Sequence, residues 1–295
     1  MFKRKVSVIP LDHNGANGSH DPALAPASLR GRPDDKPDSI VQVEDVHKSF
    51  VMGREAVPAL RGVSLEVRRG EVLCLMGPSG SGKTTLLNII GGLDTPSRGH
   101  VIVDSQNVIS LNEEKLARLR LRKMGFVFQN FNLLSNFTAL ENVQVPMVLI
   151  GQLNPKHAQE LLRLVGLGDR MDHYPSELSG GQQQRVAIAR ALANDPPLII
   201  GDEMTGDLDT ATSYEIMELL VRLNKDRGTT VVFVTHDPRM SAFATRVIYV
   251  RDGKLEEAEA NPSAATAAPA AAAAPAATSS ASPGPARAVL AGANA

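Results

Sequence analysis

The apolar residues of this chain gather in short runs, and these runs predict β-strands. A run of about five apolar residues bounded by turn residues is typical of a buried strand in a parallel sheet. Val72–Met76, Leu198–Asp202 and Thr230–Thr235 are such runs. The earlier runs predict an antiparallel side sheet instead. The full set of predicted strands is 40–46, 59–67, 72–76, 100–103, 124–128, 198–202, 230–235 and 246–251.

Other segments have the spacing of helices. Residues from about 130 to 194 predict a mostly helical region. Within it, Pro155–Val165 carries apolar residues at the spacing of one helix face. Further helices are predicted at Thr85–Ile90 and Gln182–Leu192. Strands and helices together predict the α/β fold class.

The length of 295 residues allows one large α/β domain with tails. Residues 1–38 are rich in Gly, Pro, Asp and Ser, and we expect them to be disordered. The domain is predicted at 39–257. In 258–295 alanine alternates with prolines, and each proline would remove a helical hydrogen bond. We expect this Ala/Pro-rich segment to be a disordered tail.

Charge, cysteine content and hydropathy limit the partners. The net charge of −1 provides no global basic field, so no nucleic acid is expected as a partner. The local basic residues from Arg118 to Lys123 predict a solvated helix face. The single cysteine, Cys74, lies in a predicted strand and is interpreted as a core residue.

No apolar stretch approaches the roughly twenty residues that span a bilayer. The basic start of the chain is followed by a short apolar patch broken at Pro10, which does not match a signal peptide. We therefore expect exposure to the cytoplasm and membrane association through a partner.

A phosphate-binding loop follows the strand 72–76. It fits the pattern G-x-x-x-x-G-K-[ST], in which glycines let backbone N–H groups turn toward an anion. The lysine adds a positive charge for phosphate, and the threonine hydroxyl suits Mg²⁺. The nucleotide-binding residues predicted here are Gly77, Pro78, Ser79, Gly80, Ser81, Gly82, Lys83, Thr84 and Thr85.

Two acids and a histidine follow other predicted strands. Asp202 is placed to hold Mg²⁺, and Glu203 to orient an attacking water. Solvated acids after a strand are the alternative interpretation. His236 follows the strand 230–235, and carboxyl ends of parallel strands are where α/β sheets form sites.

The stretch Leu178–Gln182, reading Leu-Ser-Gly-Gly-Gln, adds a second motif downstream of the phosphate loop. Together, in this order, the motifs resemble the nucleotide-binding cassette of the ABC transporter superfamily, over about residues 39 to 255. The resemblance implies a P-loop NTPase core of RecA-like type, an antiparallel β subdomain and a helical subdomain at about 130–194. It also implies ATP and Mg²⁺ as cofactors and ATPase activity.

The resemblance implies further roles. His236 matches a residue that contacts the γ-phosphate, and Gln129 matches a glutamine that reaches Mg²⁺. Phe50 matches the aromatic residue that stacks on adenine, although tyrosine is more usual there and a buried core phenylalanine is the alternative. Gly206–Asp209 matches a loop that communicates across a dimer of cassettes.

The signature motif, Ser179, Gly180, Gly181 and Gln182, opens a predicted helix and forms a second anion site. It cannot easily hold the same phosphate as Lys83 within one cassette. The resemblance therefore implies a head-to-tail homodimer in which each signature motif acts on the other copy's ATP.

Two residues depart from the usual cassette sequence. Met204 follows Glu203 where proline is common, and Gly201 stands where a small residue such as alanine is usual. Neither removes a chemical group. They leave open whether the local turn, and so the rate, is altered.

Segments 127–134, 138–143 and 174–185 resemble the macrolide-exporter and lipoprotein-release branch. This implies an ATP-hydrolysing subunit, on the cytoplasmic side of the membrane, that drives export or release by a separate polytopic permease. Gln129 to about Ile150 is predicted to dock a loop of that permease, with a core turn as the alternative. A cell-division or signalling ATPase is the alternative function. One cassette without sustained heptads argues against a DNA or ribosome ATPase.

Overall fold

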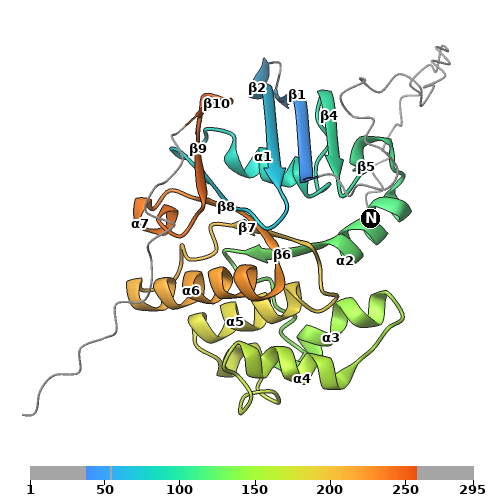
Figure 1. Cartoon of the computed structure of the whole chain (residues 1–295), viewed down its shortest axis with the longest axis vertical. Coiled ribbons are helices and arrows are strands. Elements are labelled where there is room, and N and C mark those ends of the chain that lie inside the picture. The colour runs from blue at the N-terminus through green and yellow to red at the C-terminus, as the bar shows by residue number, and fades with distance from the viewer. Residues whose placement is uncertain (1–37, 54, 258–295) are drawn as a thin grey trace, which may run out of the picture.

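The computed structural model describes residues 38–53 and 55–257. Figure 1 shows three layers: antiparallel strands at the top, a second sheet in the middle and helices below it. The tails predicted to be disordered, 1–38 and 258–295, lie outside the described residues except for Asp38.

The middle layer is a six-stranded sheet with the order β10-β9-β3-β8-β7-β6. All neighbours are parallel except β10, which pairs antiparallel with β9. Side chains of β3 alternate between two apolar cores, with Leu73 and Leu75 on one face and Val72 and Cys74 on the other. The bounds are β3 Val72–Met76, β6 Met124–Phe128, β7 Leu198–Asp202, β8 Thr230–Thr235, β9 Arg246–Arg251 and β10 Lys254–Glu257.

The upper layer is a four-stranded antiparallel sheet with the order β2-β1-β4-β5, which confirms the predicted side sheet. Helix α1 (Lys83–Ile90) packs between the two sheets, and its apolar residues join the core that β1 and β2 share with β3. The bounds are β1 Ser39–Met52, β2 Glu55–Arg68, β4 Arg98–Val103 and β5 Gln106–Asn107.

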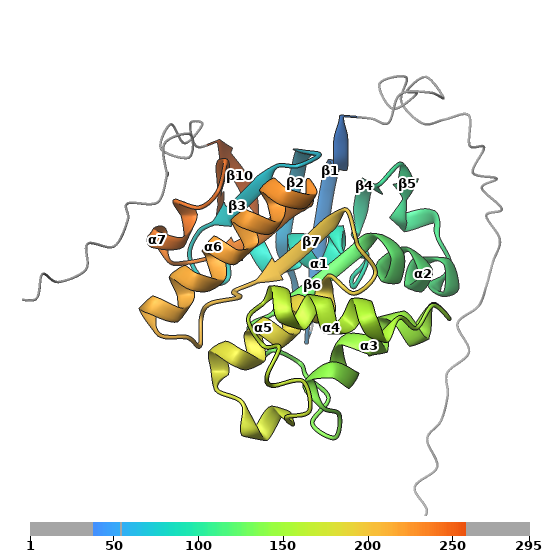
Figure 2. The same ribbon diagram turned by 60° about the horizontal axis from the view of Figure 1, so that its bottom comes forward.

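Helices α3, α4 and α5 form the lowest layer, as Figure 2 shows from below. Each begins at a polar side chain that accepts a backbone N–H of the first turn: Thr138, Asn154 and Ser179. The bounds are α2 Glu113–Lys123, α3 Ala139–Leu149, α4 Pro155–Leu164, α5 Gly180–Ala191, α6 Thr210–Arg227 and α7 Pro238–Ser241, with 3₁₀ turns at Val108–Ser110 and Pro175–Glu177.

The predicted helices and central strands are found with small shifts at their ends. Strand β1 extends six residues beyond the predicted 40–46, to Met52, and β2 begins at Glu55 rather than 59. Helix α1 begins at Lys83 rather than Thr85, and α5 begins at Gly180 rather than Gln182. Strand β10 and helix α6 were not predicted from the sequence. Within residues 38–53 and 55–257, no helix is both long and apolar enough to cross a bilayer.

Candidate functional site

The carboxyl ends of β3, β8 and β7 meet at one edge of the central sheet because these strands are parallel neighbours. Met76 of β3 pairs with Thr235, and Val234 pairs with Asp202. Open α/β sheets bind ligands at this edge. The structure therefore brings the phosphate loop (residues 77–84), the predicted acids and His236 to one place.

Two glycines let the phosphate loop approach its neighbours. Gly77 has φ 151°, and a Cβ atom there would lie 2.1 Å from the Val250 carbonyl oxygen. Gly82 has φ 103°, and a Cβ atom there would lie 2.5 Å from the Ala59 carbonyl oxygen. Any larger residue would collide with backbone at either position, so the loop requires glycine.

The same loop offers donors for an anion. The first-turn N–H groups of α1 have no intrahelical acceptor, as at any helix N-terminus, and Gly82 has no side chain to accept from them. The Ser81 hydroxyl is buried without a hydrogen-bond partner among the described residues. No acidic residue stands in the first turn of α1. Unpaired donors at a helix N-terminus fit a phosphate group.

Lys83 lies inside this loop with 5% of its surface exposed. Its Nζ donates to the carbonyl oxygens of Gly77 and Pro78, each at 2.8 Å. Burial lowers the pKa of the Lys83 ammonium below its ordinary value, while the carboxylates of Glu203 and Asp202 act in the opposite direction. The two acids thus help to keep a buried cation charged at the loop.

Thr84 and Asp202 form an oxygen pair between the loop and β7. The Thr84 hydroxyl donates to Asp202 Oδ1 at 3.1 Å. Burial raises the pKa of Asp202 above its ordinary value, which the Thr84 hydrogen bond opposes and the charge of Glu203 reinforces. A hydroxyl beside a carboxylate is a donor set that fits Mg²⁺.

Glu203 and His236 face each other across the ends of β7 and β8. His236 Nδ1 lies 3.2 Å from Glu203 Oε2, and Glu203 is half-buried. The Glu203 N–H donates to the Val234 carbonyl oxygen at 3.2 Å, and its φ of 45° turns the chain sharply after Asp202. Asp202 therefore contacts the Thr84 hydroxyl, whereas Glu203 lies beside His236.

Met204 and Gly201, the two departures from the usual cassette sequence, touch each other. A Cβ atom at Gly201 would lie 2.3 Å from Met204 Sδ. Met204 is 3% exposed, and its carbonyl oxygen accepts a hydrogen bond of 2.5 Å from Gln184 Nε2 on α5. The turn after Glu203 is therefore held by a buried side chain and by the signature helix.

Gln129 does not join the Thr84–Asp202 pair through a hydrogen bond. Its Nε2 donates instead to Asp207 Oδ1 at 2.9 Å. Asp207 was noticed in the sequence only as part of the loop Gly206–Asp209. Gln129 and Asp207 are 78 positions apart in the sequence, so no local pattern indicates this contact.

The signature residues form a capping box. Ser179 Oγ accepts from the Gln182 N–H at 3.3 Å, and Gln182 Oε1 accepts from the Ser179 N–H at 3.0 Å. A Cβ atom at Gly181 would lie 2.5 Å from Thr212 Cγ2, so α5 begins close against α6. Ser179 itself is exposed. Figure 1 shows α5 in the lowest layer, apart from α1.

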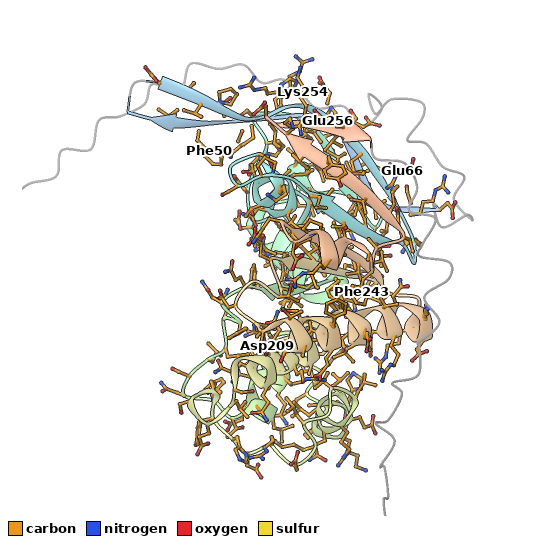
Figure 3. All side chains as sticks on the ribbon, turned by 90° about the vertical axis from the view of Figure 1, so that its left-hand side faces the viewer. Phe50, Glu66, Asp209, Phe243, Lys254 and Glu256 are labelled. Carbon is orange, nitrogen blue, oxygen red and sulfur yellow. The ribbon has the colours of Figure 1, made fainter. Side chains whose placement is uncertain are left out.

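Phe50 lies on β1 with 42% of its surface exposed, which excludes a core role. Lys48 Nζ lies 5.0 Å from the centre of its ring. Figure 3 shows Phe50 in the layer of the antiparallel sheet and Asp209 in the lower part of the molecule. The ring is available to stack on a planar group.

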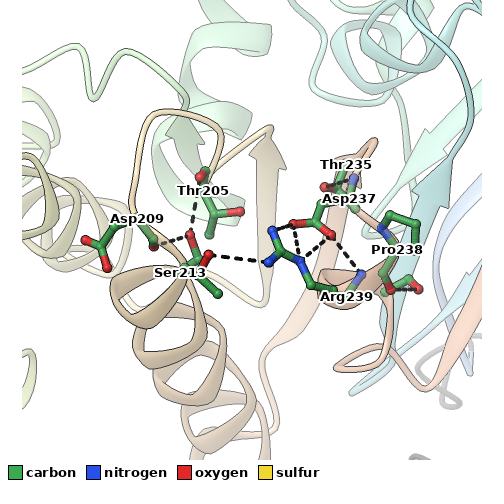
Figure 4. A network of polar contacts seen from close by, with 9 residues as sticks. Thr205, Asp209, Ser213, Thr235, Asp237, Pro238 and Arg239 are labelled. Carbon is green, nitrogen blue, oxygen red and sulfur yellow. Dashed lines mark hydrogen bonds and ion pairs between the residues drawn. The ribbon is translucent and has the colours of Figure 1, made fainter.

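A further polar network connects the loops after β7 and β8 (Figure 4). Arg239 pairs with Asp237 at 2.7 Å and donates to the Thr210 hydroxyl at 3.3 Å. Its hydrogen bonds lower the pKa of Asp237 below the ordinary value. Because Asp237 follows His236 and Thr210 opens α6, the network fixes one loop against the other. No pattern in the sequence predicted this network.

The ABC transporter sequence family matches residues 60–206. An uncharacterized ABC transporter ATP-binding protein of Thermotoga maritima is 51% identical over 75% of this chain and 95% of its own length. This chain belongs to the ABC transporter family. It is an ATP-binding cassette that hydrolyses ATP.

The solved structures agree with the fold predicted for an ABC cassette. The MJ0796 cassette of Methanocaldococcus jannaschii has a TM-score of 0.70 and 46% identity, covering 75% of this chain and 98% of that chain. That structure is a dimeric post-hydrolysis state bound to ADP and Pi.

Some relatives of this cassette are longer. The macrolide export ATP-binding/permease protein MacB of Syntrophobacter fumaroxidans is 50% identical over 74% of this chain, but the chain covers 31% of that protein. ABC transporter H family member 2 of Dictyostelium discoideum is 50% identical over 76% of this chain and 44% of its own length. The chain thus spans less than half the length of these two relatives.

Proposed function

We propose that this cassette binds Mg·ATP at the carboxyl edge of its central sheet and drives a separate polytopic membrane permease. The observation that carries the proposal is the convergence of three strand ends. There a phosphate loop with unpaired donors, the Thr84–Asp202 pair and the Glu203–His236 pair lie together.

The phosphate loop and Lys83 hold the β- and γ-phosphates through backbone N–H groups and a buried positive charge. Thr84, Asp202 and the carboxamide oxygen of Gln129 would hold Mg²⁺. When bound, this cation neutralises charge on the phosphates and fixes their geometry. Phe50 stacks on adenine with its exposed ring face.

Glu203 accepts a hydrogen bond from the attacking water and orients it toward the γ-phosphate. General-base help of this kind contributes roughly 10²–10⁴-fold. His236 Nδ1 orients the Glu203 carboxylate across 3.2 Å and leaves Nε2 for the γ-phosphate. The Asp237–Arg239 pair holds the loop that carries His236.

The working unit is a head-to-tail homodimer. Ser179 is exposed at the start of α5, and the unpaired N–H groups of this helix lie in a different layer from the phosphate loop. Residues 179–182 therefore act on the ATP held by the second copy. The dimeric MJ0796 structure supports this proposal.

The permease docks in a groove of about 510 Å³ between β6, α2, α3 and α5. Asn132, Pro146 and Leu149 of the predicted docking segment line it, beside Phe128 of β6. Leu133 packs against the core instead, so part of this segment is structural. A mostly apolar groove fits a short helix of a membrane subunit.

The MacB relatives are named macrolide export proteins, which favours export as the direction of transport. The cassette then lies on the cytoplasmic side of the membrane and is held there by its permease. ATP-driven dimerisation closes the two cassettes, and hydrolysis releases them.

The direct test is ATP binding by the variant Lys83→Ala. Losing a charge-assisted contact costs about 2–4 kcal/mol, which is roughly a 30- to 1,000-fold weaker Kd in calorimetry. Lys115→Ala, at an exposed residue of α2, is the matched control and should bind as the parent does. Unchanged affinity in a folded Lys83→Ala protein would contradict the phosphate-loop assignment.

A further inference from the structure

Gln129 and Asp207 follow neighbouring strands of the central sheet. β6 and β7 are parallel, and Phe128 pairs with Asp202. Gln129 therefore begins its loop beside the acids of β7. Its side chain spans to the loop after Glu203, where Nε2 donates to Asp207 Oδ1 at 2.9 Å.

The chemistry of this contact fixes the orientation of the amide. An ionised carboxylate accepts hydrogen bonds and donates none, so Asp207 must face the NH₂ group of Gln129. The Gln129 carboxamide oxygen is then the end of the group that remains for another partner. Oxygen is also the atom that Mg²⁺ requires.

The loop that carries Asp207 is well anchored. The Gly206 N–H donates to the Glu203 carbonyl oxygen at 2.9 Å, and the Leu208 N–H donates to the Thr205 carbonyl oxygen at 3.2 Å. Asp209 caps α6. A Cβ atom at Gly206 would lie 3.2 Å from Gln129 Nε2, so glycine leaves room for the amide against the loop.

We propose that Asp207 is a positioning residue for Gln129, which turns the carboxamide oxygen toward the Mg²⁺ site and ties it to the loop of Glu203. The proposal rests on the metal site assigned above. A second group that orients a metal ligand in this way contributes about 10- to 100-fold to metal affinity. In this role Asp207 acts through Gln129.

The experiment is calorimetric ATP binding by the full chain in the Glu203→Gln background, once in EDTA and once in Mg²⁺. The Kd in EDTA divided by the Kd in Mg²⁺ gives the metal effect, that is, how much Mg²⁺ strengthens ATP binding. Asp207→Ala should lower this ratio about tenfold and leave the Kd in EDTA unchanged. Gln129→Ala should lower it similarly, and the double variant should lose nothing more.

Two controls accompany these variants. Asp207→Asn keeps an accepting oxygen and should retain most of the metal effect. Glu218→Ala removes the same charge from an exposed position of α6 and should change nothing. Thermal melting of each variant confirms that it is folded.

The proposal is overturned if Asp207→Ala keeps the parent ratio while Gln129→Ala lowers it. It is also overturned if Asp207→Ala weakens ATP equally with and without Mg²⁺, because that result indicates a damaged loop. If Gln129→Ala keeps the ratio, the metal assignment of Gln129 fails as well. Lys83→Ala still tests ATP binding independently.

Discussion

Met204 fills a space that exists because residue 201 is glycine. Met204 Sδ lies only 2.3 Å from the position that a Cβ atom at residue 201 would take, and the Met204 side chain is buried. The two departures from the usual cassette sequence thus compensate for each other. They also connect β7 to the turn of Glu203, so a change at either should reach the Glu203 carboxylate.

We expect Gly201→Ala to destabilise the protein by about 1–3 kcal/mol, because the added methyl group overpacks the site. The shorter side chain of Met204→Ala makes room for that methyl group. The double variant should therefore be more stable than the sum of the single effects predicts, by at least about 0.5 kcal/mol in urea denaturation. Additive single effects would show that the two side chains do not share the space.

Cys74 is fully buried in β3, directly before the phosphate loop. Burial raises the pKa of its thiol to about 12, so the group stays protonated and unreactive at neutral and mildly alkaline pH. We expect iodoacetamide at pH 8 to label the unfolded chain and to spare the native one. Rapid labelling of native protein, followed by mass spectrometry, would contradict the buried position of β3.

At the scale of elements, the central strands were predictable because buried parallel strands read as continuous apolar runs. The runs at 72–76, 198–202 and 230–235 agree with the bounds of β3, β7 and β8. Strand β10 was missed because Lys254–Glu257 is mostly polar and forms a strand only by pairing with β9. Helix α6 was missed, although Asp209 and Gly228 mark its ends.

Side-chain partners could not be predicted in the same way. The sequence motifs placed Lys83, Thr84 and Asp202 correctly at one edge of the sheet. Each motif follows or ends a buried parallel strand, and the carboxyl ends of parallel strands share one edge. The contact of Gln129 with Asp207 depends on how two loops pack, and their sequence separation hides it. The packing of Met204 against Gly201 is equally a tertiary effect.

Helix α6 ends at Gly228, which has φ 66° and no atom within 4 Å of an added Cβ. Gly228→Ala meets no steric neighbour, but it places an L-residue in the left-handed region at a cost of about 1 kcal/mol. Gly228→Asn should cost less, because asparagine tolerates this conformation. Thermal melting checks both, and an alanine variant as stable as the parent would contradict the left-handed C-terminus.

At the scale of the whole molecule, the start of helix α5 and the loops after β6 and β7 converge. A Cβ atom at Gly180 would lie 3.5 Å from Leu208 and 3.7 Å from Phe131. The signature helix, the loop after Glu203 and the segment near the proposed docking groove are therefore in contact. Arg190 of α5 also donates to the carbonyl oxygens of Phe131 and Asn132, at 2.8 and 2.6 Å. A movement at the groove can reach the turn of Glu203 through packed residues.

The central claim is that ATP bound at this edge holds two cassettes together as a dimer. Hydrolysis of that ATP, which depends on Glu203, then separates the two cassettes. Glu203→Gln keeps the size and an accepting oxygen of the side chain but loses its charge and basicity. It should bind ATP as the parent does and hydrolyse it at least about a hundredfold more slowly.

Gel filtration of Glu203→Gln with Mg·ATP tests this claim most directly. We predict elution as an ATP-bound dimer, whereas the same variant carrying Lys83→Ala should elute as a monomer. A Glu203→Gln protein that turns over ATP at a near-normal rate and stays monomeric would contradict both the catalytic role of Glu203 and the ATP-joined dimer.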